Sequence, residues 1–253
     1  MIAKNNAKKG GLSDKIVPII LAIISAISIL TTIAILFTLL TETITFFTRV
    51  PLSKFFLSGT WNPTGSSPEF GIWALIIGTL KITVIATIVA VPIGLGAAIY
   101  LNEYASDRSR RIIKPILEIL AGIPTIVFGF FALTFVTPIL RNLIPNLGEF
   151  NSISPGIVVG IMIVPMITSM SEDAMSSVPD KIREGAFGLG ATKFEVATKV
   201  VLPAATSGVV ASIVLGISRA IGETMIVSLA AGSSPTSSLS LTSSIQTMTG
   251  YIV

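Results

Sequence analysis

The feature that most constrains this chain is a series of five long apolar stretches that are almost free of charge. About 20 apolar residues are needed to cross a bilayer as a helix, and a helix satisfies its own backbone hydrogen bonds in lipid. Charged residues make up only 12% of the chain, well below the fraction typical of a soluble domain. The sequence therefore predicts an all-α, polytopic transmembrane helical bundle. The five stretches are 16–40, 72–101, 115–140, 155–170 and 204–231.

The first stretch could also belong to a secretory signal peptide, because four Lys residues precede it. Its uncharged run of 25 residues is longer than the apolar core of roughly 7–15 residues in a signal peptide. No clear small-x-small cleavage site follows it. We therefore interpret residues 1–15 as a basic tail, 16–47 as an uncleaved first transmembrane helix, and 72–253 as the main transmembrane domain.

Basic residues divide unevenly between alternate loops, and this division predicts the orientation of the chain. Twelve Lys and Arg residues lie in the N-terminal tail, in segment 102–114 and in segment 171–203, whereas three lie in the alternate loops. Cytoplasmic loops carry the excess of Lys and Arg. With five spans, we expect the N-terminus and both basic segments to be cytoplasmic. The segments expected outside are 48–71, 141–154 and 232–253.

The residue types absent from the chain exclude several kinds of enzyme. It contains neither Cys nor His, which removes disulfides, thiolate metal sites and the commonest general base. No Gly-Lys dipeptide occurs, so the chain has no phosphate-binding loop of the G-x-x-x-x-G-K-[ST] type. A membrane-embedded lipid-modifying transferase would need an acid–base group in the bilayer, for which Glu223 could serve. We predict no catalytic residue and no metal site.

Segment 171–203 is too long for a simple connection between helices. Asp180 follows a proline and is expected to cap a first short helix, which Gly190 ends. Thr192 is expected to cap a second helix, which Pro203 breaks before the membrane. Both helices are amphipathic, so together they need a partner surface. Their apolar residues are Ile182, Ala186, Leu189, Phe194, Ala197, Val200 and Val201.

One part of this segment resembles the EAA loop of bacterial ATP-binding-cassette (ABC) importer permeases. That pattern is Glu-Ala-Ala, three residues, Gly, nine residues, then Ile-x-Leu-Pro. Gly185 replaces an Ala of the pattern and Val200 replaces the Ile. In the family the loop docks on a separate ATPase subunit; the alternative is a connector lying on the membrane surface. The resemblance implies these ATPase-coupling residues: Glu184, Gly185, Ala186, Gly190, Leu202 and Pro203.

Further runs resemble phosphate ABC transporter permeases, and the PstC type more than the PstA type. The resemblance covers residues 61–232, and it implies the MetI-like fold of type I importers. Members have a sixth core span, so we expect that span to be missing from this chain. The runs are Trp61-Asn62-Pro63, Gly78-Thr79-Leu80, Ala98 to Tyr104, Lys114 to Thr125, and Arg219 to Met225.

The resemblance also implies a function and a set of partners. The chain would be a permease subunit that moves inorganic phosphate across the bacterial cytoplasmic membrane, with sulfate or molybdate as the alternative cargo. Its partners would be a second permease of PstA type, an ATPase dimer of PstB type, a periplasmic phosphate-binding protein of PstS type, and membrane lipid, but not nucleic acid. ATP and Mg would be bound by the ATPase, and no cofactor by this chain.

Arg219 and Glu223 lie four residues apart in the fifth stretch, so on one helix they would share a face. A guanidinium presents a fork of donors that suits phosphate oxygens. A nearby carboxylate would keep the anion from binding too tightly. We therefore predict that the pair lines the substrate pathway; the alternative is a purely structural ion pair. Lys81, in the second stretch, could add positive potential or extend to the membrane surface.

Overall fold

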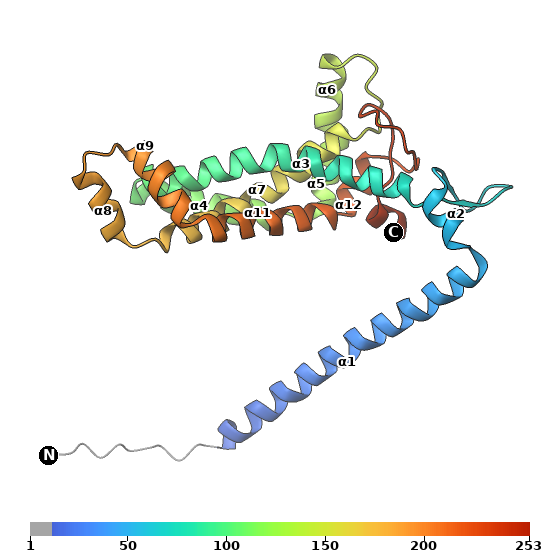
Figure 1. The fold of residues 1–253 in the computed structure, drawn as a ribbon, viewed down its shortest axis with the longest axis horizontal. Coiled ribbons are helices and arrows are strands. Elements are labelled where there is room, and N and C mark those ends of the chain that lie inside the picture. The colour runs from blue at the N-terminus through green and yellow to red at the C-terminus, as the bar shows by residue number, and fades with distance from the viewer. Residues whose placement is uncertain (1–11) are drawn as a thin grey trace. The chain divides into compact units, whose positions relative to one another are not determined.

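The described part of the chain, residues 12–253 of the computed structural model, is mainly helical and divides after Phe55 into two units (Figure 1). The first unit consists of α1, Leu12–Arg49, and the start of α2, Leu52–Leu57. Side chains 16–45 are exposed. Thr hydroxyls on α1 donate to carbonyls of the preceding turn, as Thr32 does to Ser28 at 2.9 Å. An apolar surface with satisfied hydroxyls suits lipid, and α1 contains the predicted helix 16–47.

The second unit begins with a two-stranded antiparallel hairpin and continues as a helical bundle. The strands are β1 (Trp61–Asn62) and β2 (Glu69–Phe70). The long helices are α3 (Trp73–Ile99), α7 (Ile153–Ser176) and α11 (Thr206–Ile221). The shorter helices are α4 (Asp107–Ala121), α5 (Thr125–Phe131), α6 (Thr137–Leu143), α8 (Asp180–Gly188), α9 (Lys193–Glu195), α10 (Leu202–Ala204), α12 (Met225–Ala230) and α13 (Met248–Ile252), with π-helical turns η1 (Tyr100–Tyr104), η2 (Ala132–Val136) and η3 (Val196–Val201).

Within the described residues, four helical segments are long and apolar enough to cross a membrane. A fifth candidate is a bent pair of helices whose two parts meet at 76°. This number agrees with the five spans predicted from hydropathy. The four segments are Ile16–Arg49, Trp73–Tyr104, Thr125–Leu143 and Ile153–Ser176, and the bent pair is Lys193–Ala204 with Thr206–Ile221.

The prediction of one continuous span over 115–140 is wrong. Helix α4 ends at Ala121, and the next helix begins only at Thr125. Pro124 lies in this break, where it lacks an N–H group and keeps the preceding residue out of helical conformation. The membrane-crossing segment is therefore Thr125–Leu143, and α4 is a separate charged helix with no fully buried residue.

The predicted span 155–170 is too short. Helix α7 continues through Pro165 to Ser176, because neighbouring helices accommodate a proline inside a membrane helix. The first six residues of the predicted loop 171–203 are consequently helical. Ser171 and Glu172 are buried in the bundle.

Small residues allow α3 and α7 to approach closely, and this contact forms the centre of the second unit. Ala86 and Ala90 lie four residues apart on α3, and Gly156 and Gly160 lie four apart on α7. A Cβ added at Gly160 would lie 2.8 Å from Cβ of Val89. Helices in lipid associate through such small residues because the bilayer provides no hydrophobic force between them.

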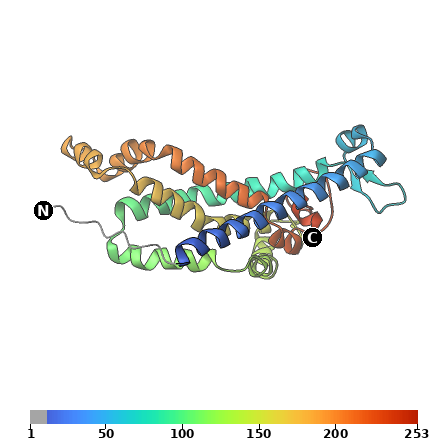
Figure 2. The same cartoon turned by 90° about the horizontal axis from the view of Figure 1, so that it is seen from below.

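Helix α11 lies beside this pair, and the three helices run together in both views (Figures 1 and 2). Gly216 of α11 packs against Ile167 of α7. The hydroxyls of Ser171 and Ser212 are hydrogen-bonded at 2.6 Å between the same two helices. The buried core therefore runs along α3, α7 and α11.

The polar segment 232–247 folds back onto α3. The Lys81 ammonium donates to the carbonyl of Ser238 and, at 2.8 Å, to that of Ser240. The backbone of Gln246 lies directly over Gly78, where an added Cβ would overlap its carbonyl. These contacts account for the burial of Lys81, which is 7% exposed, without a bound anion.

We expect Gly160→Ala to lower the thermal unfolding midpoint of the detergent-solubilised protein. The added methyl group overpacks the α3–α7 contact, at a cost of about 1–3 kcal/mol. The matched control is Gly96→Ala, where a new Cβ meets no atom within 4 Å and Ala is the better helix former. Tryptophan fluorescence during heating measures both midpoints. A wild-type midpoint for Gly160→Ala would contradict the close contact.

Candidate functional site

The α8–α9 unit, residues 180–195, confirms the predicted arrangement of two short helices around Gly190. Gly190 has a φ of +85°, a left-handed conformation that a residue with a Cβ adopts at a cost. Thr192 caps α9 in a capping box: its hydroxyl accepts from the Glu195 N–H, and the Glu195 carboxylate accepts from the Thr192 N–H. The first cap differs from the prediction, because Pro179 holds the cap position and Asp180 begins α8.

The apolar residues after Gly190 divide between two environments. Ala197 and Val201 are buried, and Val201 packs in an apolar cluster with Ala98 of α3 and Met175 of α7. Leu189 and Phe194, in contrast, are 92% and 66% exposed. The buried side chains fix the segment to the bundle. The exposed ones need another partner surface.

A groove of about 420 Å³ lies along the exposed side of the α8–α9 unit. Both apolar and charged side chains line it, which is typical of a surface that binds a protein partner. Its lining residues are Ala186, Leu189, Gly190, Ala191, Glu195, Lys199 and Val200.

The predicted coupling residues fall into two groups. Glu184 and Gly185 are exposed on α8 and Ala186 is half-buried, whereas Gly190 forms the turn to α9. Leu202 and Pro203 lie apart from these, in α10. The chain bends by 76° after Ala204, so the predicted break occurs one residue beyond Pro203.

The prediction that Arg219 and Glu223 share one helix face is wrong. Helix α11 ends at Ile221, and Gly222 and Glu223 lie in the break before α12. The ion pairs of the described residues do not include one between Arg219 and Glu223. The end of α11 at Ile221 removes the one-turn spacing that a continuous helix would give the two side chains.

Each member of the predicted pair has a different environment. Glu223 is 7% exposed, and its carboxylate accepts a hydrogen bond from the Ile226 N–H at 3.3 Å. Its backbone carbonyl accepts from the Thr249 hydroxyl at 2.8 Å. Arg219 is exposed in the last turn of α11, with no hydrogen-bond or ion-pair partner among residues 16–253, whose side chains the structure describes. Arg219 is therefore available to a ligand or another chain, whereas Glu223 stabilises the break.

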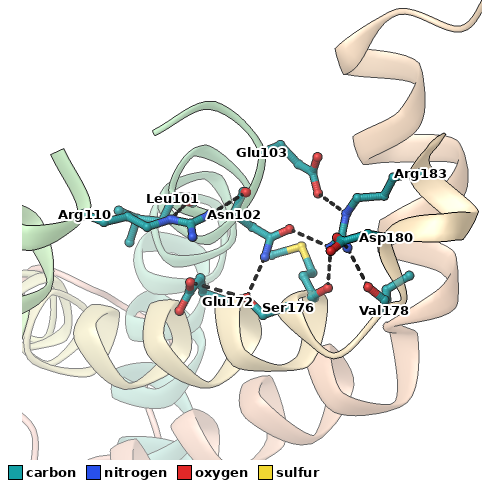
Figure 3. A network of polar contacts seen from close by, with 10 residues as sticks. Leu101, Asn102, Glu103, Arg110, Glu172, Ser176, Val178, Asp180 and Arg183 are labelled. Atoms are coloured by element: carbon teal, nitrogen blue, oxygen red, sulfur yellow. Dashed lines mark hydrogen bonds and ion pairs between the residues drawn. The ribbon is translucent and has the colours of Figure 1, made fainter. Parts of the chain in front are cut away.

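A partly buried polar cluster that the sequence did not predict lies beside the α8–α9 unit (Figure 3). Its centre is Arg183 of α8, whose guanidinium contacts Glu103 at 3.2 Å and Asn102 at 3.2 Å. Both partners lie in η1, about eighty residues earlier in the chain. An amphipathic helix that contains an Arg gave only a weak signal, because the side chains of Asn102 and Glu103 come from a distant segment.

The family described as binding-protein-dependent transport system inner membrane component matches residues 90–253. The chain belongs to this family. Its members are transport components, so the prediction of a membrane transport subunit instead of an enzyme is confirmed, and a lipid-modifying transferase is excluded.

Relatives in this family carry the names of ABC permeases. YqgH of Bacillus subtilis, a probable ABC transporter permease protein, is 38% identical over 71% of this chain and 58% of its own length. The phosphate transport system permease protein PstC of Haemophilus influenzae is 37% identical over 72% of this chain and 63% of its own length. PstC of Mesorhizobium japonicum is 34% identical over 79% of this chain and 66% of its own length. The chain thus spans less than two thirds of these relatives.

The fold agrees with a solved structure of the same type. A chain of the MetNI methionine ABC transporter in an inward-facing conformation matches with a TM-score of 0.52, 22% identity, and coverage of 64% of this chain and 76% of that chain. The predicted MetI-like helical permease fold is therefore confirmed.

We expect Gly190→Ala to loosen the α8–α9 unit without unfolding the bundle. An added Cβ meets no atom within 4 Å, so the penalty comes from the left-handed backbone alone and amounts to about 1 kcal/mol. Hydrogen–deuterium exchange should be faster over residues 180–195 and unchanged in α7. The matched control is Gly188→Ala, which has the same open space without the positive φ. Equal exchange rates in Gly190→Ala and Gly188→Ala would show that the turn does not depend on the left-handed backbone of Gly190.

Proposed function

We propose that this chain is the permease subunit of an ATP-driven importer that moves inorganic phosphate across the bacterial cytoplasmic membrane. The observation that carries the proposal is the α8–α9 unit, with its EAA-type spacing and exposed Leu189 and Phe194 beside a groove. A separate ATPase dimer of PstB type binds ATP and Mg and docks on this unit. The family and the PstC relatives support this assignment.

The remaining partners follow from the same proposal. A second permease of PstA type completes the channel, and a periplasmic binding protein of PstS type delivers phosphate. The basic segments 102–114 and 171–203 both lie at the α8–α9 end of the second unit, so this end is cytoplasmic. The four Lys residues of the N-terminal tail assign the N-terminus to the cytoplasm by the same rule. ATP then closes the ATPase dimer, which displaces the α8–α9 unit and changes the access of the spans.

Arg219 is the residue proposed to meet the anion. An Arg facing lipid near a helix centre costs about 2.5–3.5 kcal/mol, so its exposed face must be covered by another subunit or by water. Irregular backbone at membrane depth is also tolerated only where it is buried or lines a water-filled cavity. The break at residues 222–224 therefore supports a pathway beside Arg219. Glu223 lies beside this pathway and holds the break in shape.

Docking of the ATPase should depend on the exposed apolar side chains. We expect Leu189→Ala combined with Phe194→Ala to weaken binding of the ATPase subunit by about thirtyfold or more, as loss of interface hot spots does. Co-purification and titration with the ATPase in nanodiscs measure the effect. The control is Leu239→Ala, which is 80% exposed but lies in segment 232–247. Unchanged binding of the ATPase to the double variant would contradict its docking on the α8–α9 unit.

Phosphate uptake should depend on the guanidinium of Arg219. In proteoliposomes that contain the complete transporter, we expect Arg219→Gln to reduce uptake of labelled phosphate by about tenfold or more and Arg219→Lys to restore part of it. Ser218→Ala, one residue away on an exposed position, is the control. ATPase binding should be unchanged in all three. Full uptake by Arg219→Gln would overturn the pathway role.

Sulfate or molybdate remains the alternative cargo. The uptake assay separates the cargoes by competition: excess unlabelled phosphate should suppress uptake, whereas sulfate and molybdate should leave it unchanged. Suppression by sulfate or molybdate instead would keep the ABC permease assignment and change its substrate.

A further inference from the structure

Arg183 is the main polar anchor between α8 and the rest of the bundle. Helix α8 has no fully buried residue, so apolar burial contributes little to its position. The Arg183 side chain is only 14% exposed. Figure 3 shows its guanidinium directed toward Asn102 and Glu103 of η1 and toward Val178, just after α7.

All five N–H groups of this guanidinium have an acceptor. Nε donates to Glu103, and Nη2 donates to the Asn102 side chain and to the Met175 carbonyl at 2.7 Å. Nη1 donates to the Val178 carbonyl and to Asp180 at 3.0 Å. The acceptors belong to η1, to α7 and the turn after it, and to α8 itself. A Lys at this position has three donors and no planar fork, so it cannot make the same set.

The cluster continues from Arg183 toward α4. The Asn102 amide donates to the Ser176 hydroxyl at 2.8 Å, and Ser176 donates to Glu172 at 3.5 Å. Glu172 forms an ion pair with Lys114 of α4 at 2.6 Å. From the other side, Arg110 of α4 donates to the Leu101 and Asn102 carbonyls, both at 2.7 Å. One connected set of contacts therefore joins α8, η1, α7 and α4.

The Arg183 and Glu103 side chains are 14% and 8% exposed, so removal of one of them leaves the other largely without water or a counter-charge, and the contact resists separation. We propose that Arg183 is the positioning residue that transmits displacement of the α8–α9 unit to α3, through η1, and to α7. This inference rests on the proposed docking of an ATPase on the α8–α9 unit. Docking uses the exposed side of that unit, and Arg183 holds the opposite side.

The first test measures solute transport per ATP in the reconstituted complete transporter. For Arg183→Gln we expect normal co-purification of the ATPase and continued ATP hydrolysis, with about tenfold less phosphate transported per ATP, as expected for a residue within a coupling network. Arg183→Lys should restore only part of the ratio. Asp180→Asn is the control, because this partner is 87% exposed and contributes little. An unchanged ratio, or loss of the ATPase, would overturn the proposal.

A milder variant covers the case in which Arg183→Gln fails to fold. Glu103→Gln removes one charge and leaves the other acceptors of Arg183 in place, so the transport ratio should fall by a smaller factor. Combining Arg183→Gln with Glu103→Gln should lower the transport ratio no further than Arg183→Gln alone, because the two residues act through one contact. Independent, additive losses would contradict a shared role.

The second test separates this inference from the identity of the cargo. The chain has no native Cys, so spin labels can be placed at Lys181→Cys on α8 and Leu80→Cys on α3 without background labelling. Double electron–electron resonance in nanodiscs, with the permease alone, should give one narrow distance distribution with Arg183 and a broad one with Arg183→Gln. Equal widths would overturn the proposal even where phosphate uptake is confirmed. A broad distribution for Arg183→Gln, in a transporter that takes up no phosphate, would support the positioning role of Arg183 and reject only phosphate as the cargo.

Discussion

The close contact between α3 and α7 is the interaction on which the rest of the second unit depends. Gly156 and Gly160 leave no room for a side chain of their own, so the α7 backbone lies directly against Ile85 and Val89 of α3. In lipid such contact replaces the hydrophobic force that joins helices in water. Helix α11 then packs on the same surface through Gly216 and Ser212. The three helices form a frame with the α8–α9 unit at one end and α12 at the other (Figure 1).

The two ends of this frame differ in how their polar groups are satisfied. At the α8–α9 end, partly buried charges such as Arg183 and Glu103 pair with one another. At the other end, Lys81 and Glu223 bond mainly to backbone groups and hold irregular segments against the helices. Arg219 is the exception, because it stays exposed without a partner among the described residues. A charge left in this state on a spanning helix requires a surface that the chain itself does not supply.

Local signals predicted the features that depend on local chemistry. Gly190 and Thr192 were identified from sequence because a helix end and a helix cap each depend on a few neighbouring residues. The rules for helix ends also apply to Gly222, which could have been predicted as the end of α11 within the fifth predicted span. The apolar residues on both sides of Gly222 favoured one continuous helix instead. The partners of Lys81, and the Glu103 and Asn102 partners of Arg183, were beyond prediction, since they come from segments about eighty to 160 residues away in the chain.

Two of the corrected spans, 115–140 and 204–231, share one physical consequence. Each is broken by a short turn, at residues 122–124 and 222–224, and the helices that follow, α5 and α12, pack on each other. Gly129 of α5 lies against Ile226 and Leu229 of α12, so this contact is as close as that between α3 and α7. The i→i−4 hydrogen bonds of the preceding helices end at Gly122 and Gly222, and only i→i−3 bonds follow at Ile123 and Glu223. A change of backbone angle there therefore costs less than one inside α3 or α7. Movement of the α5–α12 pair relative to the three-helix frame would therefore concentrate at these turns, one of which follows Arg219 directly.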